Sequence, residues 1–137
     1  MSAAPEVPKL VRQWVERAEH DLLNIENNLA ASQIPWDTVC FHAQQWVEKY
    51  LKALLTLRGV DFPKTHDLTE LLVLIPANAR LGVEPALLEP LNPYSIEGRY
   101  PGVWEPIERE ETVKAVDAAR RIRDAIRALL PPEALRL

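Results

Sequence analysis

"CFHAQQWVEKYLKALL", residues 40–55, reads as a helix of about four turns with apolar residues on every side. Polar side chains, including His42 and Glu48, stand between the large apolar side chains of Phe41, Trp46 and Tyr50. A helix that is apolar all round is buried on most of its surface. Buried polar groups require hydrogen-bond partners. We therefore expect a helix that is buried on most faces and whose polar side chains are bonded to neighbours.

Prolines divide the rest of the chain into helical windows. Because proline lacks an amide donor and clashes with the preceding turn, the 12 prolines exclude long helices that run through them. The long proline-free windows are Lys9 to Ile34, Asp37 to Arg58 and Ile107 to Leu130. Apolar residues spaced by three and four predict an amphipathic helix in the first window. In the second window, we expect Asp37 to be the N-cap and Gly59 to end the helix in a left-handed conformation.

A shorter helix is predicted in "THDLTELLVLI", residues 65–75, where Asp67 and Glu70 have the spacing of a capping box. A broken helical piece over residues 83–91 and an ordered loop over residues 92–106 are expected to follow, and no alternating apolar run predicts strands. The sequence therefore predicts one all-α domain over residues 1–137, with its core at about 9–130. We expect an antiparallel, up-and-down four-helix bundle with an extra short helix between the third and last long helices.

Composition favours a cytoplasmic protein. The single cysteine, Cys40, cannot form an internal disulfide, and its apolar helical setting suggests a buried thiol in a reducing compartment. No stretch approaches the roughly 20 apolar residues of a membrane span, and the N-terminus lacks the apolar core of a signal peptide. A formal net charge of -4 argues against a broad basic surface that grips nucleic acid by phosphate charge alone. We expect neither a DNA partner nor a membrane partner.

The spacing of the ionisable residues predicts no metal and no cofactor. Metal sites in helical bundles use pairs of Glu-x-x-His, and the chain contains no such pair. Its four glycines are dispersed and match neither a phosphate-binding loop nor a dinucleotide fingerprint. Cys40 lies inside a helix with no base identifiable beside it, which makes it a poor candidate for a nucleophile.

Four segments taken together resemble the HEPN domain family, whose name stands for higher eukaryotes and prokaryotes nucleotide-binding. They are "AEHDLLNIE" (18–26), "FHAQQWVEKYLKALL" (41–55), "PKTHDLTELL" (63–72) and "YSIEGRYP" (94–101), in the order and spacing of the family. The likeness runs from about residue 11 to residue 130. It implies a helical bundle that pairs as a homodimer. It also implies a nucleotide or RNA ligand and a nucleotidyltransferase-domain partner, in an arrangement like a toxin and antitoxin pair.

Members of the family that cut RNA without a metal are known for an arginine followed by four to six residues and then a histidine. A histidine can move the proton of a ribose hydroxyl, and an arginine can neutralise the phosphate under attack. Arg99 matches the arginine, but Trp104, Glu105 and Pro106 stand where the histidine would fall, and no histidine follows His66. We therefore favour a non-catalytic or vestigial homodimeric module associated with a nucleotide or RNA.

The residues expected to bind the nucleotide or the partner are Arg99, Tyr100, His66, Gln45 and Lys49. Arg99 lies in an aromatic-rich loop that could stack a base while its guanidinium holds a phosphate. An equal alternative is an arginine in a salt bridge, with aromatic side chains that plug the end of the bundle. His66 either enters the same cleft or, as we favour, braces the start of the third helix.

Two other functions stay open at this point. The first is a toxin-like, metal-independent ribonuclease that uses Arg99 with His66 as its catalytic candidates. The second is a purely structural dimeric interaction module, which would bind no nucleotide.

Overall fold

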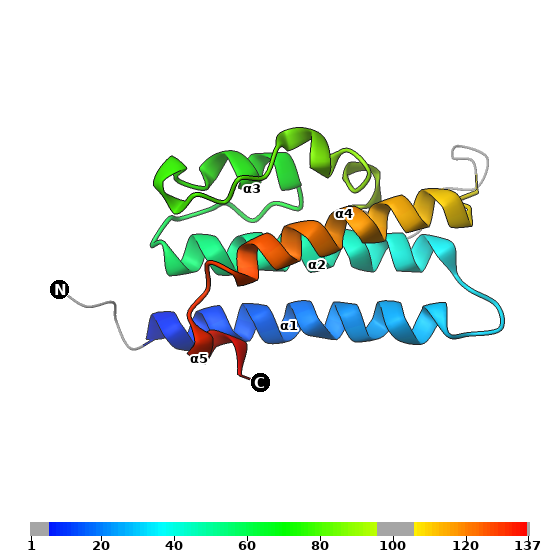
Figure 1. The fold of residues 1–137 in the computed structure, drawn as a ribbon, viewed down its shortest axis with the longest axis horizontal. Helices are drawn as coiled ribbons and strands as arrows, with labels where there is room; N and C mark the ends of the chain where they lie inside the picture. The colour runs from blue at the N-terminus through cyan, green and yellow to red at the C-terminus, as the bar shows by residue number, and fades with distance from the viewer. Residues whose placement is uncertain (1–5, 96–105, 137) are drawn as a thin grey trace.

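The computed structural model describes residues 6–95 and 106–136, and its helices form a bundle around α2 (Figure 1). The helices are α1 (Glu6–Leu29), α2 (Trp36–Leu57), α3 (Leu68–Leu74), α4 (Arg109–Arg127) and α5 (Pro132–Leu135). Between α3 and α4 lie the 3-10 turns η1 (Ala77–Ala79), η2 (Pro85–Leu88) and η3 (Asn92–Tyr94). The described residues contain no strand. The predicted all-α bundle, with extra helical structure before its last long helix, is confirmed.

Helix α2 is the element against which the others pack. It contacts α1, α3, α4 and η3, whereas α1 packs mainly against α2 and α5 (Figure 1). Trp46, Val47 and Tyr50 have no exposed surface, and Leu54 is 1% exposed. The expectation of a helix buried on most faces is therefore confirmed. No helix within the described residues is long and apolar enough to cross a membrane.

Local sequence signals explain the end of α2 better than its beginning. Pro35 occupies the N-cap position without a side-chain cap, and Asp37 lies in the first turn. The prediction of Asp37 as the N-cap is therefore wrong, although its carboxylate still suits the positive end of the helix dipole. At the other end Gly59 has φ +69°, as expected. Its N–H donates to Thr56 O at 3.1 Å, which helps to close the C-terminal turn.

The start of α3 is capped as the sequence predicts. The Asp67 carboxylate accepts from the N–H groups of Thr69 and Glu70, at 2.9 and 3.3 Å. Glu70 does not reach back to the Asp67 N–H, as it would in a simple capping box. Instead the Thr65 hydroxyl accepts from the Asp67 N–H and donates to the Glu70 carboxylate. The turn that carries His66 is thereby tied to the first turn of α3.

Candidate functional site

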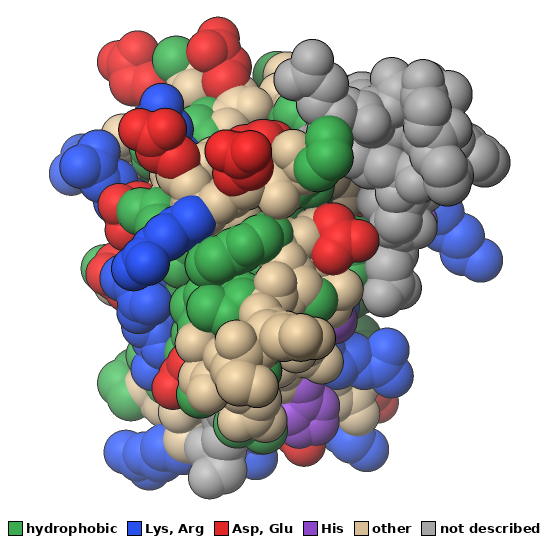
Figure 2. Space-filling model, turned by 90° about the vertical axis from the view of Figure 1, so that its right-hand side faces the viewer, with side chains coloured by type: hydrophobic (Ala, Val, Ile, Leu, Met, Phe, Trp, Pro, Cys, Tyr) green, Lys and Arg blue, Asp and Glu red, His purple; other side chains and the backbone are tan. Residues whose placement is uncertain are grey.

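Arg99 and Tyr100, two of the predicted binding residues, lie outside the described residues. A hollow of about 810 Å³ lies close in sequence to the ends of that segment, where η3 and the start of α4 come together. Its lining includes four glutamates and one lysine, Lys114, and Figure 2 shows acidic side chains on the upper part of this end of the molecule. Like charges repel, so these described walls disfavour a phosphate.

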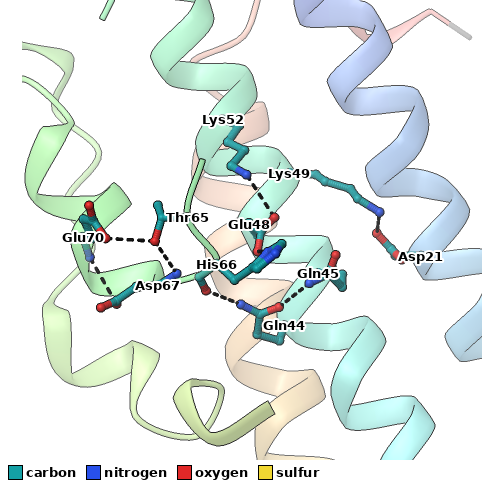
Figure 3. A network of polar contacts seen from close by, with 10 residues as sticks. All are labelled: Asp21, Gln44, Gln45, Glu48, Lys49, Lys52, Thr65, His66, Asp67 and Glu70. Atoms are coloured by element: carbon teal, nitrogen blue, oxygen red, sulfur yellow. Dashed lines mark hydrogen bonds and ion pairs between the residues drawn. The ribbon is translucent and has the colours of Figure 1, made fainter. Parts of the chain in front are cut away.

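One exposed histidine, His66, is bonded by two buried side chains of α2, one at its ring and one at its backbone (Figure 3). The side chain of His66 is 67% exposed, and its Nδ1 lies 2.9 Å from Glu48 Oε1. Gln44 Nε2 donates to the backbone oxygen of His66 at 2.7 Å. Gln44 is 0% exposed and Glu48 is 3% exposed. Burying an amide and a carboxylate is costly unless they are hydrogen-bonded, and here both bonds fix one loop residue. We call this arrangement the His66 clamp.

The His66 clamp also sets which ring nitrogen faces outward. An ionised carboxylate only accepts hydrogen bonds, so the Nδ1 beside Glu48 carries a proton. In the neutral ring Nε2 then holds the lone pair, and it has no hydrogen-bond partner among the described residues. A carboxylate that orients an imidazole in this way leaves its second nitrogen available to accept or bind. The N-cap of α3 is Asp67, and the ring of His66 is bonded to α2 instead.

Lys52 belongs to the fold and is not free for a ligand. Its Nζ lies 3.1 Å from Glu48 Oε2, and both side chains are buried. The same ammonium lies 5.6 Å from the ring centroid of Trp14 and 5.9 Å from that of Phe62. Both distances are within the range of a cation–π contact. The charge of Glu48 is thus balanced inside the protein, independently of His66.

The structure places Gln45 at the edge of the His66 clamp and Lys49 in a neighbouring cluster. Gln45 Nε2 donates to Gln44 Oε1 at 2.7 Å. Lys49 Nζ points away toward α1, where it lies 2.7 Å from Asp21 Oδ2 (Figure 3). His42 Nδ1 lies 2.8 Å from the other oxygen of Asp21, so this buried carboxylate holds two donors. Of the predicted residues, His66 and Gln45 are therefore brought together, whereas the charge of Lys49 is already neutralised.

Sequence reasoning did not single out the carboxylate of Asp21. The sequence nevertheless indicates that Asp21 is buried, because it lies three residues after Ala18 and four before Ile25 on the apolar stripe of α1. A polar residue on such a stripe must find a partner when the stripe is buried. The partner could not be identified, because His42 and Lys49 lie on another helix.

The arginines of α4 join that helix to α1. Glu19 Oε1 accepts from Arg123 Nη2 at 2.7 Å and from Arg127 Nη1 at 3.1 Å. Arg127 Nη1 also donates to Tyr50 Oη at 3.0 Å. The guanidinium of Arg123 lies 5.7 Å from the ring centroid of Trp46. Arg123 and Arg127 therefore connect α4 to both α1 and α2.

Alkaline pH provides a test of this arginine cluster. Burial raises the pKa of Tyr50 above its ordinary value of 10.0. The neutral phenol therefore contributes stability that is present below about pH 10 and is lost as the pH rises through the folded pKa. We expect the free energy of unfolding, measured by urea denaturation, to fall more steeply above about pH 10 in the wild type than in Tyr50→Phe. If the free energy of unfolding fell equally steeply with pH in the two proteins, this placement of Tyr50 would be contradicted.

Two further sequence expectations concern Cys40 and metals. The Cys40 thiol is buried, as expected, with its Sγ 3.4 Å from Thr112 Oγ1 on α4. Within residues 6–95 and 106–136, no group of three or more His, Cys, Asp or Glu side chains is arranged to hold a metal ion.

Comparison with known proteins identifies the family. A model of the HEPN domain matches residues 11–129, a range that contains α2, α3, α4 and the whole His66 clamp. Neither the curated proteins nor the solved structures give a significant match. Because the family model spans most of the sequence, the chain belongs to the HEPN domain family.

Proposed function

We propose that this protein is a non-catalytic HEPN module that binds a nucleotide or RNA as a homodimer. The observation that carries the proposal is the His66 clamp, in which buried Glu48 bonds the exposed imidazole and buried Gln44 bonds the backbone oxygen of the same residue. An imidazole held in this way loses little further freedom when a ligand binds, which favours affinity. Gln45 lies beside it and has an amide suited to hydrogen bonds with a base edge.

The proposed dimer and protein partner rest on family membership. We propose that two copies pair and that the module acts with a nucleotidyltransferase-domain protein, in a two-component arrangement like a toxin and antitoxin. Arg99 and Tyr100 belong to the proposed binding surface on the strength of the "EGRYP" segment. Sedimentation equilibrium should give about twice the chain mass of 15.6 kDa, and a monomer at micromolar concentration would contradict the dimer.

Nucleotide binding is tested by thermal shift and calorimetry with ATP, GTP and short RNAs. We expect at least one ligand to stabilise the wild type, by about 2.7 kcal/mol at a hundredfold excess over Kd. His66→Ala and Arg99→Ala should each reduce this stabilisation, because they remove the imidazole and the guanidinium of the proposed surface. His20→Ala is the matched control, since His20 is an exposed histidine on α1. No stabilisation of the wild type by any of these ligands would refute nucleotide binding.

A second function, metal-independent RNA cleavage, is favoured by one observation. The Glu48 carboxylate orients His66 with Nε2 outward, which is an arrangement suited to general acid or base catalysis. The proposed reaction would use His66 with Arg99, in place of the histidine that the family motif lacks. Cleavage of a mixed RNA pool in the presence of a chelator would support it, provided that His66→Ala removes the activity and His20→Ala retains it. Equal inactivity of all three proteins would leave the binding function alone.

A further inference from the structure

A second hollow, of about 410 Å³, lies between α3, η1 and the chain that follows η1. Val73 is 70% exposed, a larger fraction than for the other exposed large apolar residues described. Ile75, Leu81 and Val83 also line the hollow and are only half-buried. Leu71, by contrast, is fully buried. We call this hollow the α3 groove. Helix α3 thus has a second apolar side that the described residues do not cover.

Arg80 is the only charged residue among the described residues that line the α3 groove. It has φ 57° and ψ 42°, a left-handed conformation that costs free energy for residues with a Cβ. Gly82, two residues later, adopts the same region with φ +68° and without that cost. The Arg80 side chain is exposed and has no ion-pair partner among the described residues, whereas Arg123 and Arg127 are both paired with Glu19. A cationic side chain therefore occupies a position where the backbone favours glycine.

We propose that the α3 groove is the docking site of a protein partner that inserts an apolar side chain beside a carboxylate. The half-buried walls would bury more apolar surface when such a side chain enters. The unpaired guanidinium of Arg80 can form two parallel hydrogen bonds to one carboxylate at the rim. Charge complementarity favours this partner, because Arg80 is the one charged side chain among the described residues that line the α3 groove.

The α3 groove differs from the surface proposed for the nucleotide. His66, Gln45 and Gln44 are absent from its lining, and its walls are apolar apart from Arg80. A single cation among apolar side chains suits a carboxylate on a peptide better than a polyphosphate, which requires several charge-assisted contacts. The α3 groove would therefore receive a protein partner at a surface separate from the nucleotide site, and this assignment rests on the partnership proposed above.

Titration of the full chain with two matched peptides tests the proposal. The probes are acetyl-Leu-Leu with a free carboxylate and the same peptide as a carboxamide, followed by the amide resonances of the protein in NMR spectra. We expect shifts in α3 and residues 77–83, and an affinity for the carboxylate about tenfold higher than for the carboxamide. Arg80→Gly should abolish this preference without lowering Tm, because φ 57° suits glycine.

Two further variants make the outcome decisive. Arg17→Gln is the matched control, since Arg17 lines a smaller hollow of about 190 Å³ with Leu10 and Trp14, and it should leave binding unchanged. Val73→Asp places a competing carboxylate in the α3 groove on an exposed position, so it should fold normally and bind neither peptide. Equal affinities for the two peptides, shifts confined to other helices, no shifts at all, or wild-type binding by Val73→Asp would overturn the proposal.

Discussion

Glu48→Ala is expected to lower the free energy of unfolding by about 3 kcal/mol or more, because it leaves the buried ammonium of Lys52 without its carboxylate. The contacts of Lys52 with the rings of Trp14 and Phe62 compensate only in part, since a cation–π contact contributes about 0.5–2 kcal/mol. The bond to the exposed ring of His66 is also lost, and it adds little because solvent screens it. Urea denaturation monitored by circular dichroism measures the effect.

Two controls distinguish the loss of the buried Glu48–Lys52 pair from the effect of removing any one negative charge. Asp37→Ala removes an exposed carboxylate from the first turn of α2 and should change the unfolding free energy by only about 0.5 kcal/mol. The double variant Glu48→Met with Lys52→Met replaces both charges by apolar side chains and should recover much of the loss. If Glu48→Ala alone costs less than about 1 kcal/mol, Lys52 does not depend on Glu48 in the way described.

Trp46→Ala should destabilise the protein by about 3–5 kcal/mol, since it empties a fully buried site in α2 and removes the ring near Arg120 and Arg123. Trp46→Phe should cost much less, because a second aromatic ring refills part of the site. The indole N–H of Trp46 is buried and has no hydrogen-bond partner among the described residues. Trp46→Phe removes this unsatisfied donor. The free energy gained in this way offsets part of the cost of the lost side-chain volume.

The comparison of the two tryptophan variants is made by urea denaturation with Trp36→Ala as the control. Trp36 is only half-buried at the start of α2, so its truncation should cost less than that of Trp46. If Trp46→Phe and Trp46→Ala lowered the free energy of unfolding equally, the indole N–H would make a hydrogen bond that phenylalanine cannot replace.

Features that depend on a few neighbouring residues were predictable from the sequence. The burial of α2 on most faces followed from the composition of residues 40–55, and the cap of α3 followed from the spacing of Asp67 and Glu70. The end of α2 just before Gly59 followed from the preference of glycine for positive φ. The N-cap prediction for Asp37 was wrong for a reason that is also local. Pro35 and Asp37 can each start the helix, and the sequence does not decide between them.

The partners of buried polar groups were not predictable, because they come from distant parts of the chain. Gln44 is bonded to His66, 22 residues away, and Glu19 to Arg127, 108 residues away. The position of Arg127 in the last turn of α4 suits the helix dipole, but that local effect does not reveal its contact with α1. The clamp that orients His66 required the fold, because it is made by residues of α2 that one sequence shows only as polar positions on an apolar helix.

The central position of α2 divides the proposed nucleotide site into parts of unequal mobility. Amide hydrogens of α2, which is covered by α1, α3 and α4, should exchange with solvent only when the whole domain unfolds. The turn that carries His66 has few buried apolar contacts and leads into a helix of seven residues, so its amides should exchange through local opening. Gln44 and Glu48 thus belong to the slowest-exchanging part of the molecule and His66 to a faster one. The His66 clamp can therefore open and re-form while the helix that holds it stays folded.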